Sequence, residues 1–302
     1  MDKHKIDSIL KGFYECKSPK TAQLYQSDLD SFRDYLGVDN LQSALISFFK
    51  VPHSRANLTV LHYKSLMHED GLKPATINRR LSALRSLVKG ARKDGYLRWE
   101  LDVNNEKKPP QNVITPLSSD DFDSILKLAG SQRNPLKSAR DTAILRLLHD
   151  LAMRRSSVVN LDYSDINFSE NSISVNIPGT KAKTAKLLPA KTTQSLQRWL
   201  SFRGRKKGPL FTNCDHAGKG KRLTGTSIYR IVRQLGEKID IDTGPLGIRQ
   251  TAIIKALDKA KGAGIRMSDI AAFSDHQHLS SLKAYAEHRA QVQQRLSDLV
   301  SE

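Results

Sequence analysis

The sequence predicts a mainly α-helical protein of two domains. The first domain is all-helical, and the second is a mixed α/β unit that is mostly helical with a small antiparallel sheet. Apolar residues recur at helical spacing through most of the 302 residues. A period-two alternation of apolar and polar residues is found only near residues 173–189. A polar stretch with prolines, at about residues 102–116, separates the two parts.

The first hundred residues indicate a series of helices. Ser18 followed by Pro19 is typical of an N-cap and a first helical residue, and the apolar spacing after them ends at Gly37. A second helix is expected over about residues 54–69. A third helix begins after Pro74, where proline can start a helix but not continue one.

This third helix combines an apolar stripe with a basic surface. The stripe consists of Ile77, Leu81, Leu84 and Val88. The basic residues are Arg79, Arg80, Arg85, Lys89, Arg92 and Lys93. Such a surface is either simply solvated or contacts the phosphates of a nucleic acid. Because the whole chain is strongly basic, we expect DNA-backbone contacts here, with the first four basic residues as candidates.

Residues 102–116 form the expected domain boundary. The stretch holds Pro109 and Pro110 among asparagines and lysines, with few apolar residues. Two adjacent prolines cannot continue a helix, and polar flanks have no core to join. We therefore place the domains at residues 1–106 and 107–302.

The second domain begins with helices and continues into a hairpin. Ser118 and the acidic residues after it are typical of a helix N-terminus, and a second helix is expected over residues 141–151. Residues 173–177 alternate as a strand does, and a return strand at residues 186–189 follows a lysine-rich turn. Further helices are expected at residues 192–202, 226–239, 250–260, 267–273 and about 281–300.

The formal charge is +18, which favours a polyanionic partner, nucleic acid before an acidic membrane. We find no apolar run long enough for a membrane span, no amphipathic anchor and no leader-like segment at the start. Cys16 and Cys214 lie far apart, which indicates a reducing compartment without a disulfide framework.

Five residues of the second domain form an ordered set suited to phosphodiester chemistry. Arg154 lies between two helices, Lys181 in the hairpin turn and Arg249 near a helix start, and Tyr285 lies nine positions after His276. Arginine forks can hold the nonbridging oxygens of a phosphate, and a lysine can protonate a leaving oxygen. A tyrosine hydroxyl can act as the nucleophile. A pairing of His276 with His278 as metal ligands lacks a third ligand.

The set resembles the tyrosine recombinases, the phage-integrase type of site-specific DNA recombinase. The family pattern has a G-L/M-R-x-S-E box, a hairpin lysine, an H-x-x-R-H box, a G-H box and a tyrosine. It maps in order onto Arg154, Lys181, Arg249, His276 and Tyr285. Here Leu246 replaces the first histidine of the H-x-x-R-H box, and Ser157 replaces the glutamate of the first box.

The resemblance covers the whole chain and has several implications. It implies a helical core-binding domain followed by a catalytic DNA breaking–rejoining domain. It implies a 3′-phosphotyrosyl intermediate on double-stranded DNA recombination sites and a homotetramer on synapsed DNA, with possible accessory DNA-bending proteins. Location would be cytoplasmic and nucleoid-associated in a bacterial or phage setting. The phosphotyrosyl bond keeps the phosphodiester energy, so we expect no cofactor and no metal, and the sequence contains no Walker A or GxGxxG motif.

Several alternatives stay open. Leu246 and Ser157 favour a catalytically degenerate DNA-binding relative, and a basic RNA-associated protein is a more distant reading. Within the hairpin, Lys183 and Lys186 are neighbours of Lys181, and Lys183 is also a candidate DNA contact. Tyr285 could instead be an ordinary core tyrosine on an apolar helix face.

Overall fold

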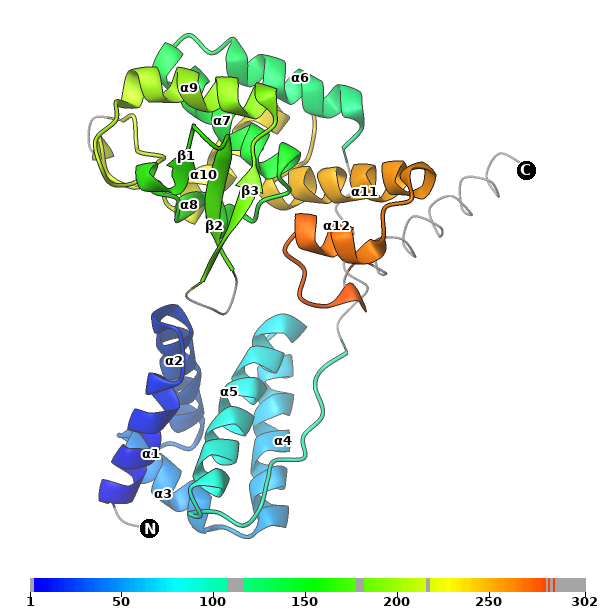
Figure 1. Cartoon of the computed structure of the whole chain (residues 1–302). Coiled ribbons are helices and arrows are strands. Elements are labelled where there is room, and N and C mark those ends of the chain that lie inside the picture. Colours follow the sequence, from blue (N-terminus) through cyan, green and yellow to red (C-terminus); the bar gives the residue numbers. More distant parts are fainter. Residues whose placement is uncertain are drawn as a thin grey trace. The chain divides into compact units, whose positions relative to one another are not determined.

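The computed structural model describes residues 3–107, 117–177, 182–215, 218–280, 282 and 285. Clustering of contacts divides the chain into two compact units, Met1–Val113 and Ile114–Glu302 (Figure 1). The described residues are mostly helical, and their strands form a small antiparallel sheet, so the predicted fold class is confirmed. None of the described helices is long and apolar enough to cross a membrane.

The first unit is a bundle of helices. They are α1 (Lys3–Glu15), α2 (Pro19–Tyr35), α3 (Leu41–Lys50), α4 (His53–Glu69) and α5 (Pro74–Lys93). The three helices expected individually from the sequence correspond to α2, α4 and α5. The side chain of Ser18 caps α2 by accepting a hydrogen bond from the Thr21 amide at 3.2 Å, and Gly37 ends the run at a φ of 66°.

The second unit combines helices with a small sheet. The helices are α6 (Ser119–Gly130), α7 (Pro135–Asp150), α8 (Arg155–Val159), η1 (Tyr163–Asp165), α9 (Ala190–Arg203), α10 (Gly225–Glu237), α11 (Pro245–Ala263) and α12 (Met267–Phe273). The strands are β1 (Ile166–Asn167), β2 (Ser172–Asn176) and β3 (Lys183–Leu187). They pair antiparallel in the order β1-β2-β3, with Ile173 opposite both Ile166 and Lys186.

Element boundaries differ from the sequence-based expectations at three places. Helix α7 begins at Pro135 rather than at residue 141, because the Asn134 side chain accepts hydrogen bonds from two amides of its first turn. Helix α11 begins at Pro245 rather than at residue 250, and β3 begins three residues before the expected strand at Lys186. Of the last expected helix, residues 282 and 285 are described as helical, and the rest lies outside the described residues.

Helix α7 is the centre of the second unit. It packs against α6, α9 and α11, and its residues from Ala143 to Leu148 are almost all fully buried. A smaller apolar cluster lies between α11, α12 and the last helix, and includes Ile253, Ile270 and Leu282. Because the end of α7, the start of α11 and the end of α12 are each fixed by packing, side chains at these ends have little freedom to move apart.

Candidate active site

The two predicted arginines lie on different elements and converge. Arg154 is the N-cap residue of α8, directly after the buried turn that ends α7. Arg249 lies in α11 and is buried, with 4% of its surface exposed. The structure therefore brings together residues that are 95 positions apart in the sequence (249 − 154).

Main-chain carbonyl groups hold both guanidinium groups. Arg249 donates one hydrogen bond to the carbonyl of Ala152 and another to the carbonyl of Ser274. Arg154 donates to the carbonyl of Asp275. The turn after α7 and the turn after α12 are thus tied together through the arginines. Burial, and then repulsion from Arg154, lower the pKa of Arg249 to about 10, so the side chain is still charged at neutral pH.

His276 is held by a buried serine. The single hydroxyl proton of Ser274 is donated to the carbonyl of Ile270 at 2.7 Å. The contact of 2.7 Å between the Ser274 Oγ and the His276 Nδ1 therefore needs the proton on Nδ1, which leaves Nε2 facing away from this bond. Burial, followed by repulsion from Arg249 and Arg154, lowers the pKa of His276 to about 4. The imidazole is neutral at pH 7 in this structure.

Tyr285 lies beside His276. The two ring centroids are 6.1 Å apart, and the rings meet edge to face at 62°. Tyr285 is partly buried and packs against the cluster that contains Leu282, so the face of its helix is also a core face. The tyrosine is near enough to Arg249 that its charge would raise the pKa of the guanidinium. Four of the five predicted catalytic residues thus lie in one cluster.

The fifth predicted catalytic residue, Lys181, lies outside the described residues. Its neighbour Lys183, predicted to contact DNA, forms an ion pair with the buried carboxylate of Asp165. Each atypical position lies three residues from one of the arginines, Ser157 after Arg154 and Leu246 before Arg249. Leu246 is 51% exposed at the start of α11, and Ser157 lies half-buried in α8.

Sequence reasoning missed Asp275 of this cluster, and it named Lys186 only as a neighbour of Lys181 in the hairpin. The Lys186 Nζ on β3 lies 2.9 Å from the Asp275 Oδ1 and donates to the carbonyl of Phe273 at 2.6 Å. Both side chains of this ion pair are about nine-tenths buried. A signal for the aspartate was present, because it stands where the family's G-H box has glycine. Its φ of 53° is the left-handed conformation that favours glycine.

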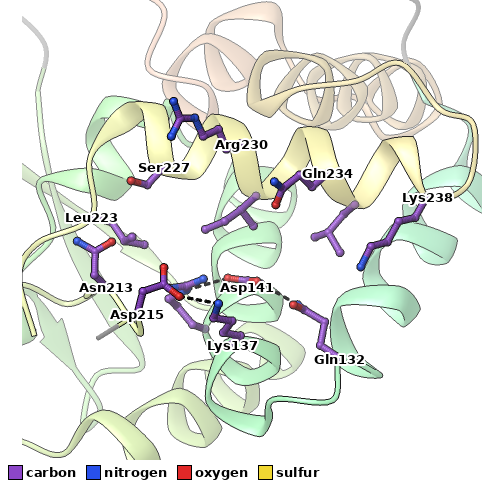
Figure 2. A pocket seen from close by; sticks show the side chains of 13 residues that line it. Gln132, Lys137, Asp141, Asn213, Asp215, Leu223, Ser227, Arg230, Gln234 and Lys238 are labelled. Atoms are coloured by element: carbon purple, nitrogen blue, oxygen red, sulfur yellow. Dashed lines mark hydrogen bonds and ion pairs between the residues drawn. The ribbon is translucent and has the colours of Figure 1, made fainter. Parts of the chain in front are cut away.

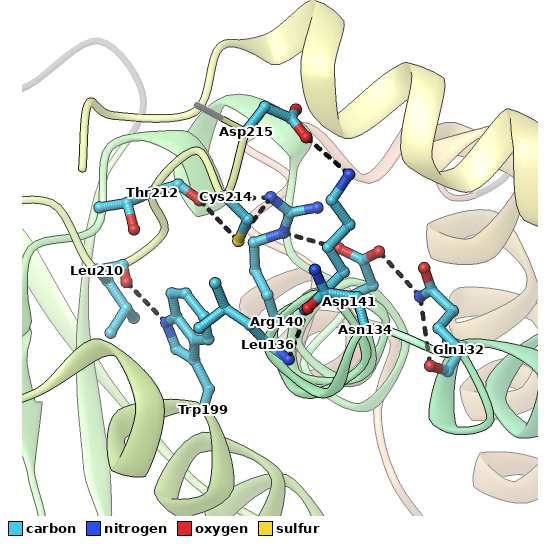
Figure 3. A network of polar contacts seen from close by, with 12 residues as sticks. Gln132, Asn134, Leu136, Arg140, Asp141, Trp199, Leu210, Thr212, Cys214 and Asp215 are labelled. Carbon is cyan, nitrogen blue, oxygen red and sulfur yellow. Dashed lines mark hydrogen bonds and ion pairs between the residues drawn. The ribbon is translucent and has the colours of Figure 1, made fainter. Parts of the chain in front are cut away.

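A separate polar network lies between α7, α10 and the loop near Cys214. A hollow of about 310 Å³ is bordered by Lys137, Arg230 and Lys238, whose side chains Figure 2 labels. Arg140 and Asp141 also line this hollow, and the buried Arg140 donates to the Asp141 carboxylate at 2.8 Å and to the Cys214 sulfur at 3.2 Å (Figure 3). Burial raises the pKa of the Cys214 thiol. None of the residues lining this hollow belongs to the arginine cluster, so we read the network as part of the core.

In the first unit, the predicted DNA contacts on α5 divide into two groups. Arg79 forms a two-pronged bond with the buried Asp28, at 2.9 and 2.8 Å, and the Arg80 Nε lies 3.9 Å from the same carboxylate. Arg85 donates to the Asn105 side chain. These three arginines therefore each have a partner within the unit itself, whereas Lys89 is exposed. Of the four predicted phosphate contacts on α5, Lys89 is therefore the one whose exposed side chain can reach a phosphate without first leaving a partner such as Asp28 or Asn105.

The chain matches two family models. The phage integrase family matches residues 116–292, and the phage integrase N-terminal SAM-like domain matches residues 13–95. Tyrosine recombinase slr0733 of Synechocystis sp. is 33% identical over 292 residues, which cover 95% of this chain and 92% of the relative. Tyrosine recombinase Synpcc7942_B2651 of Synechococcus elongatus is 33% identical over 284 residues, covering 92% and 87%.

Solved structures have the same fold at lower identity. The XerH site-specific recombinase bound to palindromic difH substrate aligns with a TM-score of 0.67 and 16% identity, covering 93% of this chain and 80% of the other. The Tn1549 transposon integrase in complex with transposon right end DNA aligns with a TM-score of 0.66 and 17% identity, covering 98% and 99%. With the family models spanning most of the sequence and relatives matched almost end to end, the chain belongs to the phage integrase family and is a tyrosine recombinase.

Proposed function

We propose that this chain cleaves and rejoins double-stranded DNA at specific sites, with Tyr285 as the nucleophile. The observation that carries the proposal is the pair Arg154 and Arg249, held by carbonyl groups next to His276 and Tyr285. Two fixed guanidinium groups suit the two nonbridging oxygens of one phosphodiester. Such preorganised donors stabilise the charge that develops in the transition state, each by about 10²–10³ in rate.

The cleavage step exchanges one phosphate ester for another. The Tyr285 oxygen releases its proton to water and attacks phosphorus, and the bond from phosphorus to the 5′-oxygen breaks. Lys181 protonates this leaving oxygen as general acid, a contribution of about 10²–10⁴ in rate. The product is a 3′-phosphotyrosyl bond and a 5′-hydroxyl group. Attack by a 5′-hydroxyl group on that bond reverses the step and rejoins the strand.

His276 acts on the phosphate through Nε2, because Nδ1 is engaged with Ser274. A phosphate oxygen only accepts hydrogen bonds, so the imidazole has to be protonated to donate to it. The negative charge of an arriving phosphate opposes the effect of the two arginines and raises the pKa of His276. Proton uptake by His276 therefore accompanies DNA binding.

We also propose how the rest of the chain takes part. Residues 1–106 form the core-binding domain, with Lys89 on α5 directed to the DNA backbone. Residues 107–302 form the catalytic domain, and four copies assemble on two synapsed duplexes, with accessory DNA-bending proteins at some sites. Support comes from relatives solved with DNA, namely XerH with its difH substrate and the Tn1549 integrase with transposon DNA. The protein would act at the nucleoid of a bacterial or phage-infected cell.

The rival proposal is a DNA-binding relative that has lost the chemistry. It is favoured by Leu246, since leucine can neither accept a proton nor bond a phosphate oxygen, and by Ser157 in place of a carboxylate. The two proposals differ in one measurable product, the covalent protein–DNA adduct.

The test begins with Tyr285→Phe, which is expected to bind DNA without cleaving it. Selection of random-sequence duplexes on this variant yields the preferred site. A nick placed near the cleaved phosphate in that site then traps the wild-type adduct. Cleavage releases a short fragment that carries the 5′-hydroxyl group, and once this fragment diffuses away the strand cannot be rejoined. We expect an SDS-resistant adduct with wild type and none with Tyr285→Phe. No adduct from wild type would favour the rival, and an adduct from the variant would move the nucleophile to another residue.

A further inference from the structure

Asp275 occupies a backbone position that usually requires glycine. Helix α12 ends at Phe273, and the amides of Asp275 and His276 bond back to the carbonyls of Ala272 and Ala271 at 3.3 and 2.9 Å. This is the Schellman pattern of a helix end, whose residue after the cap is left-handed. Asp275 has a φ of 53°. Aspartate adopts this conformation less readily than glycine, so its presence here calls for a side-chain reason.

The Asp275 carboxylate lies between two cations of the cluster. Its Oδ1 is 2.9 Å from the Nζ of Lys186, and its Oδ2 is 3.9 Å from the Nη1 of Arg154. The carbonyl of the same residue accepts a hydrogen bond from Arg154. The Arg154 Nη1 and the Asp275 Oδ2 are both buried, and neither has a hydrogen-bond partner among the described residues. The two atoms therefore face each other across a gap slightly too long for a hydrogen bond.

Lys186 connects this carboxylate to the hairpin. It lies on β3, five residues after Lys181 in the sequence, and its Nζ also donates to the carbonyl of Phe273 at 2.6 Å. A nine-tenths buried ammonium group needs such partners, because burial of an unpaired charge is costly. The single residue Asp275 thus contacts both β3 and Arg154, the N-cap residue of α8, and it is covalently next to His276.

We propose that Asp275 is a positioning residue whose carboxylate holds Lys186 and Arg154 in place for cleavage. It brings to Arg154 the negative charge that the first family box lacks at Ser157. The proposal rests on the function proposed above, and it adds a residue that the family pattern does not contain. Support also comes from charge, since Asp275 offsets in part the repulsion that the arginines exert on His276.

A competing role would be that of a resident anion which blocks the phosphate site. In that role, removal of the carboxylate would speed cleavage and tighten DNA binding together. In the positioning role, removal slows cleavage while DNA affinity is kept, because the charges that attract DNA all remain. The two roles therefore predict opposite changes in the cleavage rate.

The test compares two variants with matched controls in the full chain. Asp275→Asn keeps the size and removes the charge, and Asp275→Gly installs the residue that suits this backbone. The controls are Asp240→Asn and Asp240→Gly, because Asp240 is an exposed aspartate with a φ of 57°. The controls remove the same charge from the same backbone conformation away from the cluster. DNA affinity is measured on the intact duplex selected with Tyr285→Phe. Single-turnover cleavage is measured on the nicked form of the same duplex.

We expect both Asp275 variants to cleave at least tenfold more slowly than wild type, and up to about 100-fold, the scale of a small misplacement of reacting groups. Their DNA affinity should stay equal or become tighter, and the Asp240 controls should match wild type in both measurements. A smaller fall in rate, or any gain, overturns the positioning role. Loss of affinity in parallel with rate also overturns it, because that outcome indicates a damaged fold.

A second measurement does not depend on cleavage. The ammonium group of Lys186 should give a ¹⁵N signal in the DNA-free protein, because a buried, bonded ammonium exchanges slowly with water. That signal should vanish in both Asp275 variants and in Lys186→Met, which assigns it, and remain in both Asp240 controls. If the signal persists without the carboxylate, Asp275 does not hold Lys186, and the inference is wrong. If the signal behaves as expected but wild type forms no adduct, the contact is real and the proposed function fails.

Discussion

The lowered pKa of His276 makes the stability of the second unit depend on pH in a defined direction. The ordinary pKa of a histidine is about 6.5, which we take for the unfolded chain. In the folded protein the pKa is about 4. Between these values the unfolded chain binds a proton that the folded protein does not bind. Acidification from pH 6.5 to pH 4 therefore destabilises the folded state, and above pH 6.5 this histidine has no effect on stability.

The size of the effect follows from the difference between the two pKa values. Each tenfold change in proton affinity corresponds to about 1.4 kcal/mol, so a fall from 6.5 to about 4 sets a ceiling of about 3.4 kcal/mol. The imidazole is only partly buried, and solvent screens the repulsion from the arginines. We therefore expect about 1–2 kcal/mol of destabilisation at pH 4 relative to pH 7.

Urea unfolding at pH 7 and pH 4 measures this loss in the free energy of unfolding. Trp199 is buried in the second unit, so its fluorescence in a Trp99→Phe background reports on that unit. His276→Gln has no titrating group, and the pH-dependent loss should be about 1–2 kcal/mol smaller in this variant than in the parent. The control is His278→Gln, which removes an exposed imidazole two positions away. Equal pH dependence in parent and His276→Gln would refute the reasoning, and a histidine NMR titration would locate the error.

Three further predictions concern other parts of the molecule. Asp141→Ala should cost about 3–5 kcal/mol in the second unit, because it leaves the buried guanidinium of Arg140 without its carboxylate; a loss below 1 kcal/mol in urea unfolding would contradict this. Arg79→Ala should destabilise the first unit by about 2–3 kcal/mol through loss of the bonds to Asp28, and a change confined to DNA affinity would show that the pair is not structural. Leu246→His should raise single-turnover cleavage of the selected nicked duplex by up to about 100-fold, since it adds a proton-transfer group; a rate that falls would show that the leucine is no handicap.

The architecture was accessible from the sequence because local patterns encode it. Helical spacing, the Ser18 and Ser118 caps and the alternation near residue 173 all correspond to elements of the structure. The starts of α7 and α11 were placed too late, because the proline at the first position of each helix was not read as a helix start. The Asn134 cap of α7 and the first-position prolines Pro135 and Pro245, rather than apolar spacing, mark those starts.

The order and spacing of residues identified the catalytic candidates. They did not predict which residues these side chains, or the candidate DNA contacts, would touch. The sequence gives no sign that Arg79 and Lys183, both expected at DNA, would form ion pairs with Asp28 and Asp165. A basic residue on a helix or strand has the same sequence pattern whether its partner is a phosphate or a distant aspartate. Only packing decides which carboxylate comes within reach.

The sequence by itself determined the family, the helical character and the ordered set of catalytic candidates that ends at Tyr285. These properties depend on residue identity and spacing along the chain. The tertiary structure decided which ring nitrogen of His276 carries the proton and which carbonyl groups hold the arginines. It also decided that Asp275 lies against Arg154 and Lys186. Those features depend on the turns after α7 and α12, helix α11 and strand β3 meeting at one place. Burial there changes charge interactions that no single segment could predict.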